Sequence, residues 1–487
     1  MKYSVTSVRI FSIAAFLSVT QAAFATSWFV LPASRCANNG DGTVNACAAS
    51  DSDRGAWKGS ANIVWASIAP GDIVNFRGTW GPADCHDPVQ YCVLVQKSGN
   101  VGNPITLDFT ASSLDSNYTH TKAIATQSFS NLILKNLTAT RFTAYGIELN
   151  GGGRSTDILN IIVEAPTISY ISGCSGECDG IWGKGASIAV YNPRISQISD
   201  DGIWLDGDQS AVNFDLNDGT YYVKDVGLGP QITGDCFQFS GSGGYDANFV
   251  RKGYCDHRSV SEKHCVVSNS LGLVTVTDTV CLATPNLTTT GIYSNGRLDL
   301  ERNHISGWTI GISAATLRAA SPGPSTIAAN VVSNFGTLGI ATSTETPSGV
   351  VVTVANNTVD GANSDLTVSQ CFTLGGDGAS VVRVTNNIAT NCRYAFFRAS
   401  GTGSKTLANN IDFGNISPYY SFASGSTTVS PQFRGGATST LINYYRLNPS
   451  SPALGGGACY WANGCASADY DGVGQTVPPN IGAFGGR

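Results

Sequence analysis

The chain has 487 residues and a formal net charge of −6, and only 13% of its residues are charged. This balance argues against nucleic acid as a partner, because nucleic-acid-binding domains carry an excess of Lys and Arg. The chain holds 56 glycines and a single methionine. Val, Ile, Thr, Ser and Asn are abundant, and stretches rich in Lys and Glu, which are typical of helices, are missing. We therefore expect an all-β protein.

Residues 1–25 are organised like a secretory signal peptide. Lys2 and Arg9 form a basic region, a largely apolar run follows, and Ala23-Phe24-Ala25 has the small-x-small form of a cleavage site. We find no second apolar run of about 20 residues that would span a bilayer. We therefore expect a secreted protein, extracellular or periplasmic, in which residues 26–487 form one monomeric domain without a membrane partner.

The chain contains 14 cysteines, and an even number in an exported protein indicates disulfides. Their spacings do not resemble those of a zinc site. Four pairs lie close together in the sequence, and we expect each to form a bridge: Cys36/Cys47, Cys85/Cys92, Cys174/Cys178 and Cys459/Cys465.

Ten segments between residues 145 and 400 share a small residue followed by a bulky apolar one. A minimum spacing near 20 residues with variable excess is typical of a right-handed parallel β-helix, in which stacked coils share one core. Asparagines before the strands at 356–361, 386–390 and 408–413 fit this fold, since Asn accepts left-handed turns and can stack between coils. The small residues are Gly146, Gly180, Gly202, Cys236, Cys265, Gly291, Gly311, Gly339, Cys371 and Ala395.

Both ends of the mature chain resemble the secreted β-helix proteins that include pectate lyases and related polysaccharide-cleaving enzymes. The N-terminal motifs are APGDIVNFRGTW (69–80) and SGNVGNPITLDF (98–109), and the C-terminal ones are YRLNPSSPALGGG (445–457) and DYDGVGQTVPPNIGAFGG (469–486). The resemblance implies N-terminal coils, a closing C-terminal coil and a polysaccharide partner.

Alternation along the strands predicts two outward rows of side chains. The first contains Trp182, Trp204, Gln238 and Tyr293, and the second contains Lys184 and Asp206. Exposed indoles mark an interaction surface, so we expect sugar rings to bind here. The alternative is that a loop covers both tryptophans.

A third column, directly before the small residues, contains Asp179, Asp201, Asp235 and His264. Burying three carboxylates would be unfavourable, so we expect this column to line the edge of an open cleft. The alternative is that the acids cap backbone N–H groups in turns. Because Cys236 and Cys265 share a column, we expect them to pair across coils, and Cys255 and Cys281 likewise.

Two reactions fit this groove, and the first is β-elimination on a uronate polymer. The resemblance to pectate-lyase-type enzymes implies calcium, for which the clustered acids Asp179, Asp200, Asp201 and Asp235 are candidate ligands, and no organic cofactor. The segment RKGYCDHRSVSEKHC (251–265) is expected to bring cations, among them Arg258, to the same groove. Lys263 is the first candidate for the base, with His264 and Tyr293 as rivals.

The second reaction is inverting hydrolysis, with Asp201 and Asp235 as acid and base. Here the column is similar to that of the polygalacturonase family, with His264 at the position of the family histidine. Gly234 replaces the first of that family's paired acids, and Tyr293-Ser294-Asn295 stands in place of Arg-Ile-Lys. The third possibility is a non-catalytic, glycan-binding β-helix.

Overall fold

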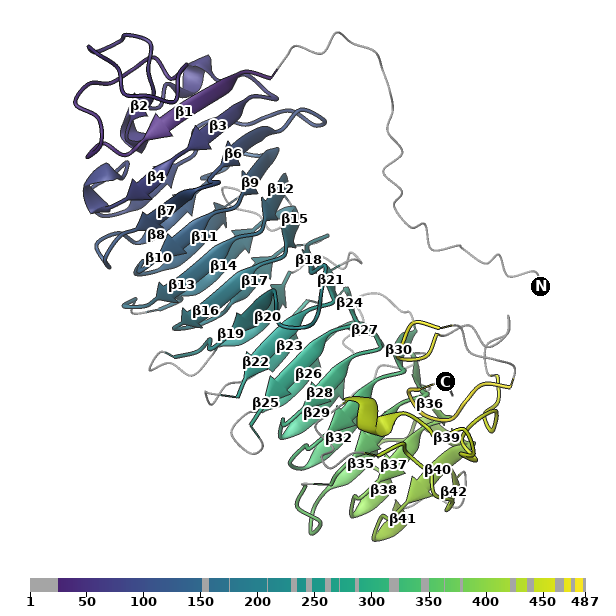
Figure 1. The fold of residues 1–487 in the computed structure, drawn as a ribbon. Helices are drawn as coiled ribbons and strands as arrows, with labels where there is room; N and C mark the ends of the chain where they lie inside the picture. The colour runs from purple at the N-terminus through teal and green to yellow at the C-terminus, as the bar shows by residue number, and fades with distance from the viewer. Residues whose placement is uncertain are drawn as a thin grey trace.

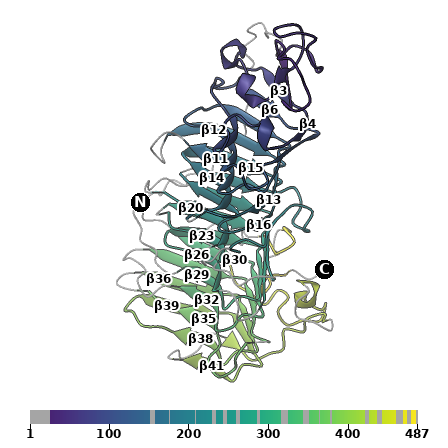
Figure 2. The same ribbon diagram turned by 90° about the vertical axis from the view of Figure 1, so that its left-hand side faces the viewer.

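The computed structural model describes residues 25–484 except 151–156, 175, 208, 229–233, 242–247, 259–263, 271, 285–288, 315–323, 343–349, 363, 377–379, 421–425, 436–441, 460–467 and 474–477. The predicted signal peptide and Lys263 therefore lie outside the described residues. The described part is one elongated right-handed parallel β-helix, as predicted, and its strands stack coil upon coil (Figures 1 and 2). Its few helices are 3-10 turns, and none of them could cross a membrane.

Each coil contributes one strand to each of three parallel sheets. The 15-stranded sheet contains β1 (Ser27–Leu31), β2 (Trp57–Lys58), β3 (Ile73–Phe76), β6 (Ile105–Asp108), β9 (Leu132–Lys135), β12 (Ile158–Glu164), β15 (Ala186–Tyr191), β18 (Ala211–Asn213), β21 (Asn248–Arg251), β24 (Leu273–Thr277), β27 (Arg297–Glu301), β30 (Ser325–Ala328), β33 (Val351–Ala355), β36 (Val381–Thr385) and β39 (Ser404–Ala408). The 14-stranded sheet contains β4 (Gly78–Trp80), β7 (Ser112–Asp115), β10 (Thr138–Thr140), β13 (Thr167–Ile171), β16 (Arg194–Ile198), β19 (Tyr222–Lys224), β22 (Tyr254–His257), β25 (Val280–Ala283), β28 (His304–Ser306), β31 (Val331–Ser333), β34 (Thr358–Asp360), β37 (Ile388–Thr390), β40 (Asn410–Phe413) and β42 (Ser426–Thr427).

The 13-stranded sheet carries all ten predicted repeats and faces the viewer in Figure 2. It contains β5 (Tyr91–Leu94), β8 (Lys122–Ala125), β11 (Tyr145–Asn150), β14 (Asp179–Lys184), β17 (Ile203–Asp206), β20 (Asp235–Ser240), β23 (His264–Ser268), β26 (Thr290–Ser294), β29 (Ile310–Ala314), β32 (Leu338–Thr342), β35 (Gln370–Leu374), β38 (Tyr394–Arg398) and β41 (Ser417–Tyr420). The 3-10 helices are η1 (Ser60–Asn62), η2 (Trp65–Ser67), η3 (Pro82–Asp84) and η4 (Ile442–Tyr445).

The small residue of the repeat lies where the 13-stranded sheet packs against the 14-stranded one. A Cβ on Gly180 would come within 2.5 Å of the Gly202 carbonyl oxygen in the next coil and 2.8 Å of the Ile195 side chain in β16. Contacts this short exclude larger residues at a crowded interior position. The bulky residues that follow, such as Ile181 and Ile203, are buried in the core as predicted.

A buried asparagine ladder runs along the C-terminal coils. Asn357 donates to Asn387 Oδ1 through both its backbone N–H (2.9 Å) and its Nδ2 (3.0 Å), and Asn387 repeats this pattern on Asn410. The preceding Asn356 and Asn386 take positive φ angles of 57° and 56°. The predicted turn geometry and the predicted stacking are therefore both confirmed.

The predicted disulfides between coils are wrong. Cys236 pairs with Cys255, and Cys265 pairs with Cys281, so each bridge closes within one coil. The small-residue column faces the 14-stranded-sheet strand of its own coil, as the contact that a Cβ on Gly180 would make with Ile195 shows. The bridges Cys36–Cys47, Cys85–Cys92 and Cys174–Cys178 are confirmed, Cys371–Cys392 is added, and Cys465 lies outside the described residues.

The C-terminal segment adds no further coil where it is described, although its motifs suggested a closing coil. It folds back and lies beside the last strands (Figure 1). Leu447, Ala453 and Ile481 pack on Ile388 and Ile411 of the 14-stranded sheet. The segment thus covers one flank of the β-helix and leaves the 13-stranded sheet to carry the site.

Candidate functional site

The four residues of the predicted column stack on consecutive coils. We call them the acid ladder: Asp179, Asp201, Asp235 and His264. Asp201 donates its backbone N–H to Asp179 Oδ1 (3.1 Å), and Asp235 donates its N–H to Asp201 Oδ1 (2.7 Å). At the end of the ladder His264 Nδ1 lies 2.8 Å from Asp235 Oδ1.

The acids of the ladder are buried and do not line an open edge, which corrects the prediction. Asp179, Asp201 and Asp235 are 0%, 4% and 3% exposed. Burial, reinforced by neighbouring carboxylates, raises the pKa of Asp179 and Asp201. The backbone N–H groups of the next coil accommodate Asp179 and Asp201, which is the capping role considered above as the alternative.

Gln238 covers the ladder from the outward row. In the amide orientation that satisfies its neighbours, its nitrogen donates to Asp235 Oδ2 (3.0 Å) and Asp201 Oδ2 (3.2 Å), and its oxygen accepts from Trp204 Nε1 (3.2 Å). One side chain therefore links two acids to an indole. It also shows that the acids point to the outer side of the sheet.

The first outward row has the predicted register, with Trp182 opposite Trp204, Trp204 opposite Gln238, and Val267 opposite Tyr293. The two tryptophans are half-buried and meet edge to face, with ring centroids 6.4 Å apart. Trp182 stacks on Tyr145, which extends the aromatic row by one coil. The aromatic rings of this row are therefore half-exposed and tilted relative to one another, and they do not form a flat surface.

The second outward row is polar, as predicted. Lys184 lies opposite Asp206, and both are half-buried. Asn295 closes a short chain of hydrogen bonds in this row, because it accepts from the Tyr293 hydroxyl (2.9 Å) and donates to Asn269 Oδ1 (3.0 Å). This chain fixes the Tyr293 ring, whose centroid lies 5.5 Å from that of His264.

The described cations Arg251 and Arg258 of segment 251–265 do not lie on the 13-stranded sheet, contrary to the prediction. Arg251 ends β21 in the 15-stranded sheet, whereas Arg258 follows β22 of the 14-stranded sheet and pairs with Asp256. One coil crosses three sheets, so residues close in sequence face different directions. Lys263, the predicted base, lies outside the described residues.

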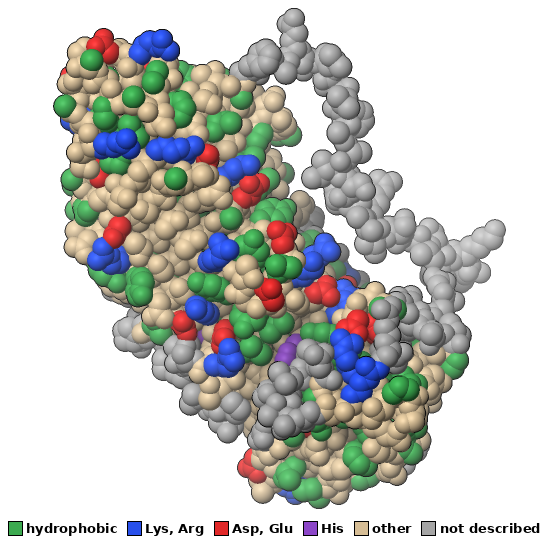
Figure 3. Space-filling model, in the orientation of Figure 1, with side chains coloured by type: hydrophobic (Ala, Val, Ile, Leu, Met, Phe, Trp, Pro, Cys, Tyr) green, Lys and Arg blue, Asp and Glu red, His purple; other side chains and the backbone are tan. Residues whose placement is uncertain are grey.

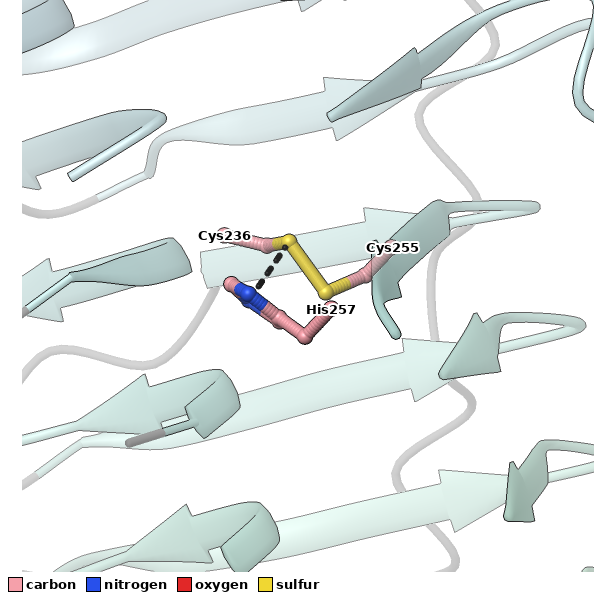
Figure 4. A group of neighbouring side chains, drawn as sticks. All are labelled: Cys236, Cys255 and His257. Carbon is pink, nitrogen blue, oxygen red and sulfur yellow. Dashed lines mark hydrogen bonds between the residues drawn. A yellow bond between two sulfur atoms is a disulfide. The ribbon is translucent and has the colours of Figure 1, made fainter. Parts of the chain in front are cut away.

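The four predicted calcium ligands do not gather into one ligand set. Among the described residues, three ligand atoms of His, Cys, Asp or Glu come within 4.8 Å of one another only at Cys236, Cys255 and His257. There the two sulfurs form a disulfide, with His257 Nε2 3.2 Å from Cys236 Sγ (Figure 4). A disulfide offers no thiolate to a metal, so this buried trio is structural.

Two charged residues that sequence reasoning missed, Lys122 and Glu177, adjoin the ladder. Lys122 binds Glu148 at 2.7 Å and lies over the rings of Tyr91 and Tyr145. Glu177 accepts from the Tyr145 hydroxyl (3.5 Å), and burial together with the Asp200 charge raises its pKa. The repeat alignment began at residue 145; extending it one coil upstream would have placed Lys122 in the same column, in register with Tyr145.

Solved structures with a similar fold share little sequence with this chain. The pectate lyase Pel9A matches 95% of this chain and 96% of its own, at 14% identity and a TM-score of 0.38. A mannuronic acid specific family 6 polysaccharide lyase from human gut microbiota covers 76% of this chain and 87% of its own, at 13% identity and a TM-score of 0.41. A rhamnogalacturonan lyase covers 84% and 90%, at 12% identity and a TM-score of 0.37.

A scan against protein-family profiles and a sequence search of curated proteins both find no match. At these values the structural likenesses describe the fold only.

Proposed function

We propose that this protein is a polysaccharide lyase that cleaves a uronate-containing polysaccharide by β-elimination. The observation that supports it is the His264–Asp235 pair, at 2.8 Å, beside the ring of Tyr293. Within the acid ladder, the His264 side chain keeps 17% of its surface exposed, against 5% for that of Asp235. An imidazole held through Nδ1 by a carboxylate keeps Nε2 for a ligand, which suits a general base.

In the proposed reaction His264 Nε2 takes the C5 proton of a uronate residue. The electron pair forms the C4=C5 double bond, and the bond from C4 to the glycosidic oxygen breaks. That oxygen receives a proton from the Tyr293 hydroxyl, which is regained from water as the imidazolium returns its own proton to water. The Asp235 carboxylate stabilises the imidazolium in between.

The other outward residues bind and orient the substrate in this proposal. Trp182 and Trp204 contact sugar rings, and Lys184 in the second row compensates the uronate carboxylate. Lys122, the cation of the column, is already engaged by Glu148. Calcium would need six to eight oxygen ligands. The stacked acids do not bring that many together, so the proposed reaction does not use calcium.

Hydrolysis fits the described geometry less well than elimination. An inverting hydrolase keeps its two carboxyl groups about 6.5–9.5 Å apart, with water between them. Here the Gln238 amide nitrogen lies between Asp201 Oδ2 and Asp235 Oδ2, and both acids are less than 5% exposed. The amide occupies the space that the water would need.

The test is incubation of the secreted chain with polygalacturonate, alginate and rhamnogalacturonan, with and without chelator. Elimination produces the ultraviolet absorbance of an unsaturated uronate, and we expect His264→Ala to slow its appearance about 10²- to 10⁴-fold while the matched His86→Ala keeps the rate. New reducing ends without absorbance would show a hydrolase instead. Polymer binding without any product would show a glycan-binding protein.

The six disulfides within the described residues also support secretion, because such bonds persist in oxidising compartments. On the face of the molecule drawn in Figure 3, acidic, basic and hydrophobic side chains are interspersed. The net charge of the chain is only −6, so we expect local contacts on the 13-stranded sheet, and not a general surface charge, to hold a polysaccharide.

A further inference from the structure

A second cleft lies where the C-terminal segment returns along the 14-stranded sheet. It encloses about 280 Å³ between the ends of β34, β37 and β40 on one side and residues 430–433 and η4 on the other. None of its walls belongs to the 13-stranded sheet. We propose that this cleft binds a neutral sugar residue, independently of the proposed lyase reaction.

Three aromatic rings line the cleft: Phe413, Phe433 and Tyr444. Phe413 ends β40 and is 41% exposed, although it is a large apolar side chain. Phe433 and Tyr444 come from the returning segment, with ring centroids 5.9 Å apart and planes tilted by 45°. Rings that stay accessible offer faces on which the C–H side of a pyranose can pack.

Hydroxyl and amide groups complete the lining, among them Thr390, Asn391, Ser430 and Gln432. They can exchange hydrogen bonds with sugar hydroxyls. The described lining is more polar than apolar, as suits a ligand that is rich in hydroxyl groups. Pockets for drug-sized ligands begin at about 300 Å³, so this cleft suits a single ring.

The polar groups are held in place before any ligand arrives. Asn391 Nδ2 donates to Asp360 Oδ1 (2.8 Å), and the Tyr445 hydroxyl donates to Asp360 Oδ2 (2.9 Å). Gln432 Oε1 accepts from Ser450 Oγ (2.9 Å). Asp360 therefore links Asn391 of the β-helix to Tyr445 of the returning segment and holds both walls of the cleft in place. A preformed cleft loses less entropy on binding.

The charge of the lining favours a neutral sugar over a uronate. Asp360 lies at the base of the cleft and is 1% exposed, and neither Lys nor Arg occurs among the described lining residues. A ligand carboxylate would therefore be desolvated without a cation. This preference is opposite to that of the proposed lyase groove, so the two sites are separable by ligand.

The experiment measures binding of neutral hexasaccharides of glucose, xylose, mannose and galactose, and of hexagalacturonate, by titration calorimetry. We expect at least one neutral hexasaccharide to bind in preference to hexagalacturonate. Phe413→Ala and Gln432→Ala should each weaken that binding, the former about tenfold through loss of one apolar contact face. Phe249→Ala is the matched control, since Phe249 is 40% exposed on β21 of another sheet.

Binding of no neutral hexasaccharide would overturn the proposal. So would equal affinity in Phe413→Ala and Phe249→Ala, or loss of binding in Trp182→Ala, which would assign the ligand to the groove. If the wild-type chain binds a neutral hexasaccharide but cleaves none of the uronate polymers, the result supports the cleft and refutes the proposed reaction. The two proposals therefore fail separately.

Discussion

Replacing Asp235 by Asn tests whether this acid assists His264 or only supports the fold. The substitution keeps the size of the side chain and an oxygen for His264 Nδ1, but it removes the negative charge 2.8 Å from the imidazole. A hydrogen bond to a charged group contributes about 1.5–3 kcal/mol. Because this charge stabilises the imidazolium that forms on proton abstraction, kcat/KM should fall about 10- to 150-fold.

The assay is the initial rate of unsaturated uronate formation, followed over a range of substrate concentration. The loss should lie mainly in kcat, because Asp235 is buried beneath Gln238 and does not reach the sugar. His264→Ala should lose about 10²- to 10⁴-fold, the usual contribution of a general base. Asp179→Asn is the control, since Asp179 belongs to the same ladder but has no contact with His264 in the described structure.

Two results would refute this reasoning. If Asp235→Asn kept its rate within about threefold, the charge beside the imidazole would have no part in the reaction. If Asp179→Asn lost as much as Asp235→Asn, both acids would act through the fold alone. Equal unfolding midpoints for the two variants would exclude a difference in stability as the cause.

Three further predictions concern stability and connectivity. Burial raises the pKa of Asp179 above its usual value of 3.8, so the folded chain binds this proton more tightly than the unfolded chain does. The contribution of Asp179 to stability therefore falls as pH rises above about 4. Urea titrations should show the stability of Asp179→Asn relative to wild type increasing from pH 4 to pH 7, and a constant difference would contradict the assigned cause. Peptide mapping without reduction should recover Cys236 linked to Cys255, and a peptide joining Cys236 to Cys265 would disprove the described pairing. Asn357→Ala should lower the free energy of unfolding by about 2–5 kcal/mol, because the Asn330 side-chain amide and the Ile327 carbonyl each lose a buried hydrogen bond. A loss below about 0.5 kcal/mol, as at a typical surface site, would contradict this account.

The sequence predicted the fold and the register because both follow from local periodicity. The small residue before a bulky apolar one recurs once per coil, and each copy lies in the same sheet. Two residues later the chain points outward, which placed Trp182, Trp204 and Tyr293 correctly. The turns at Asn356 and Asn386 were predicted because Asn tolerates left-handed geometry, and both residues have positive φ.

What failed depended on the direction of a side chain across the coil. The pairing of Cys236 was predicted from the spacing between coils, but its column points at the 14-stranded sheet. The burial of Asp201 was missed because the backbone donor that accommodates its carboxylate belongs to the next coil, 34 residues away. The cations of segment 251–265 were grouped by sequence distance, which a three-sheet coil does not preserve.

The acid ladder gives a physical reason why an aspartate precedes the small residue in three consecutive repeats. Asp179 and Asp201 each accept the backbone N–H of the next residue in the column, so each carboxylate fixes the start of the following strand. At Asp235 the next residue is His264, and the carboxylate meets an imidazole instead of a backbone donor. The same repeated contact that aligns two coils thus orients a titratable side chain at the third, and the half-exposed Tyr293 lies beside it. Because an acid is not needed in this column for folding, as Ile310 and Leu338 show, its restriction to the coils that lead to His264 favours a role at that residue.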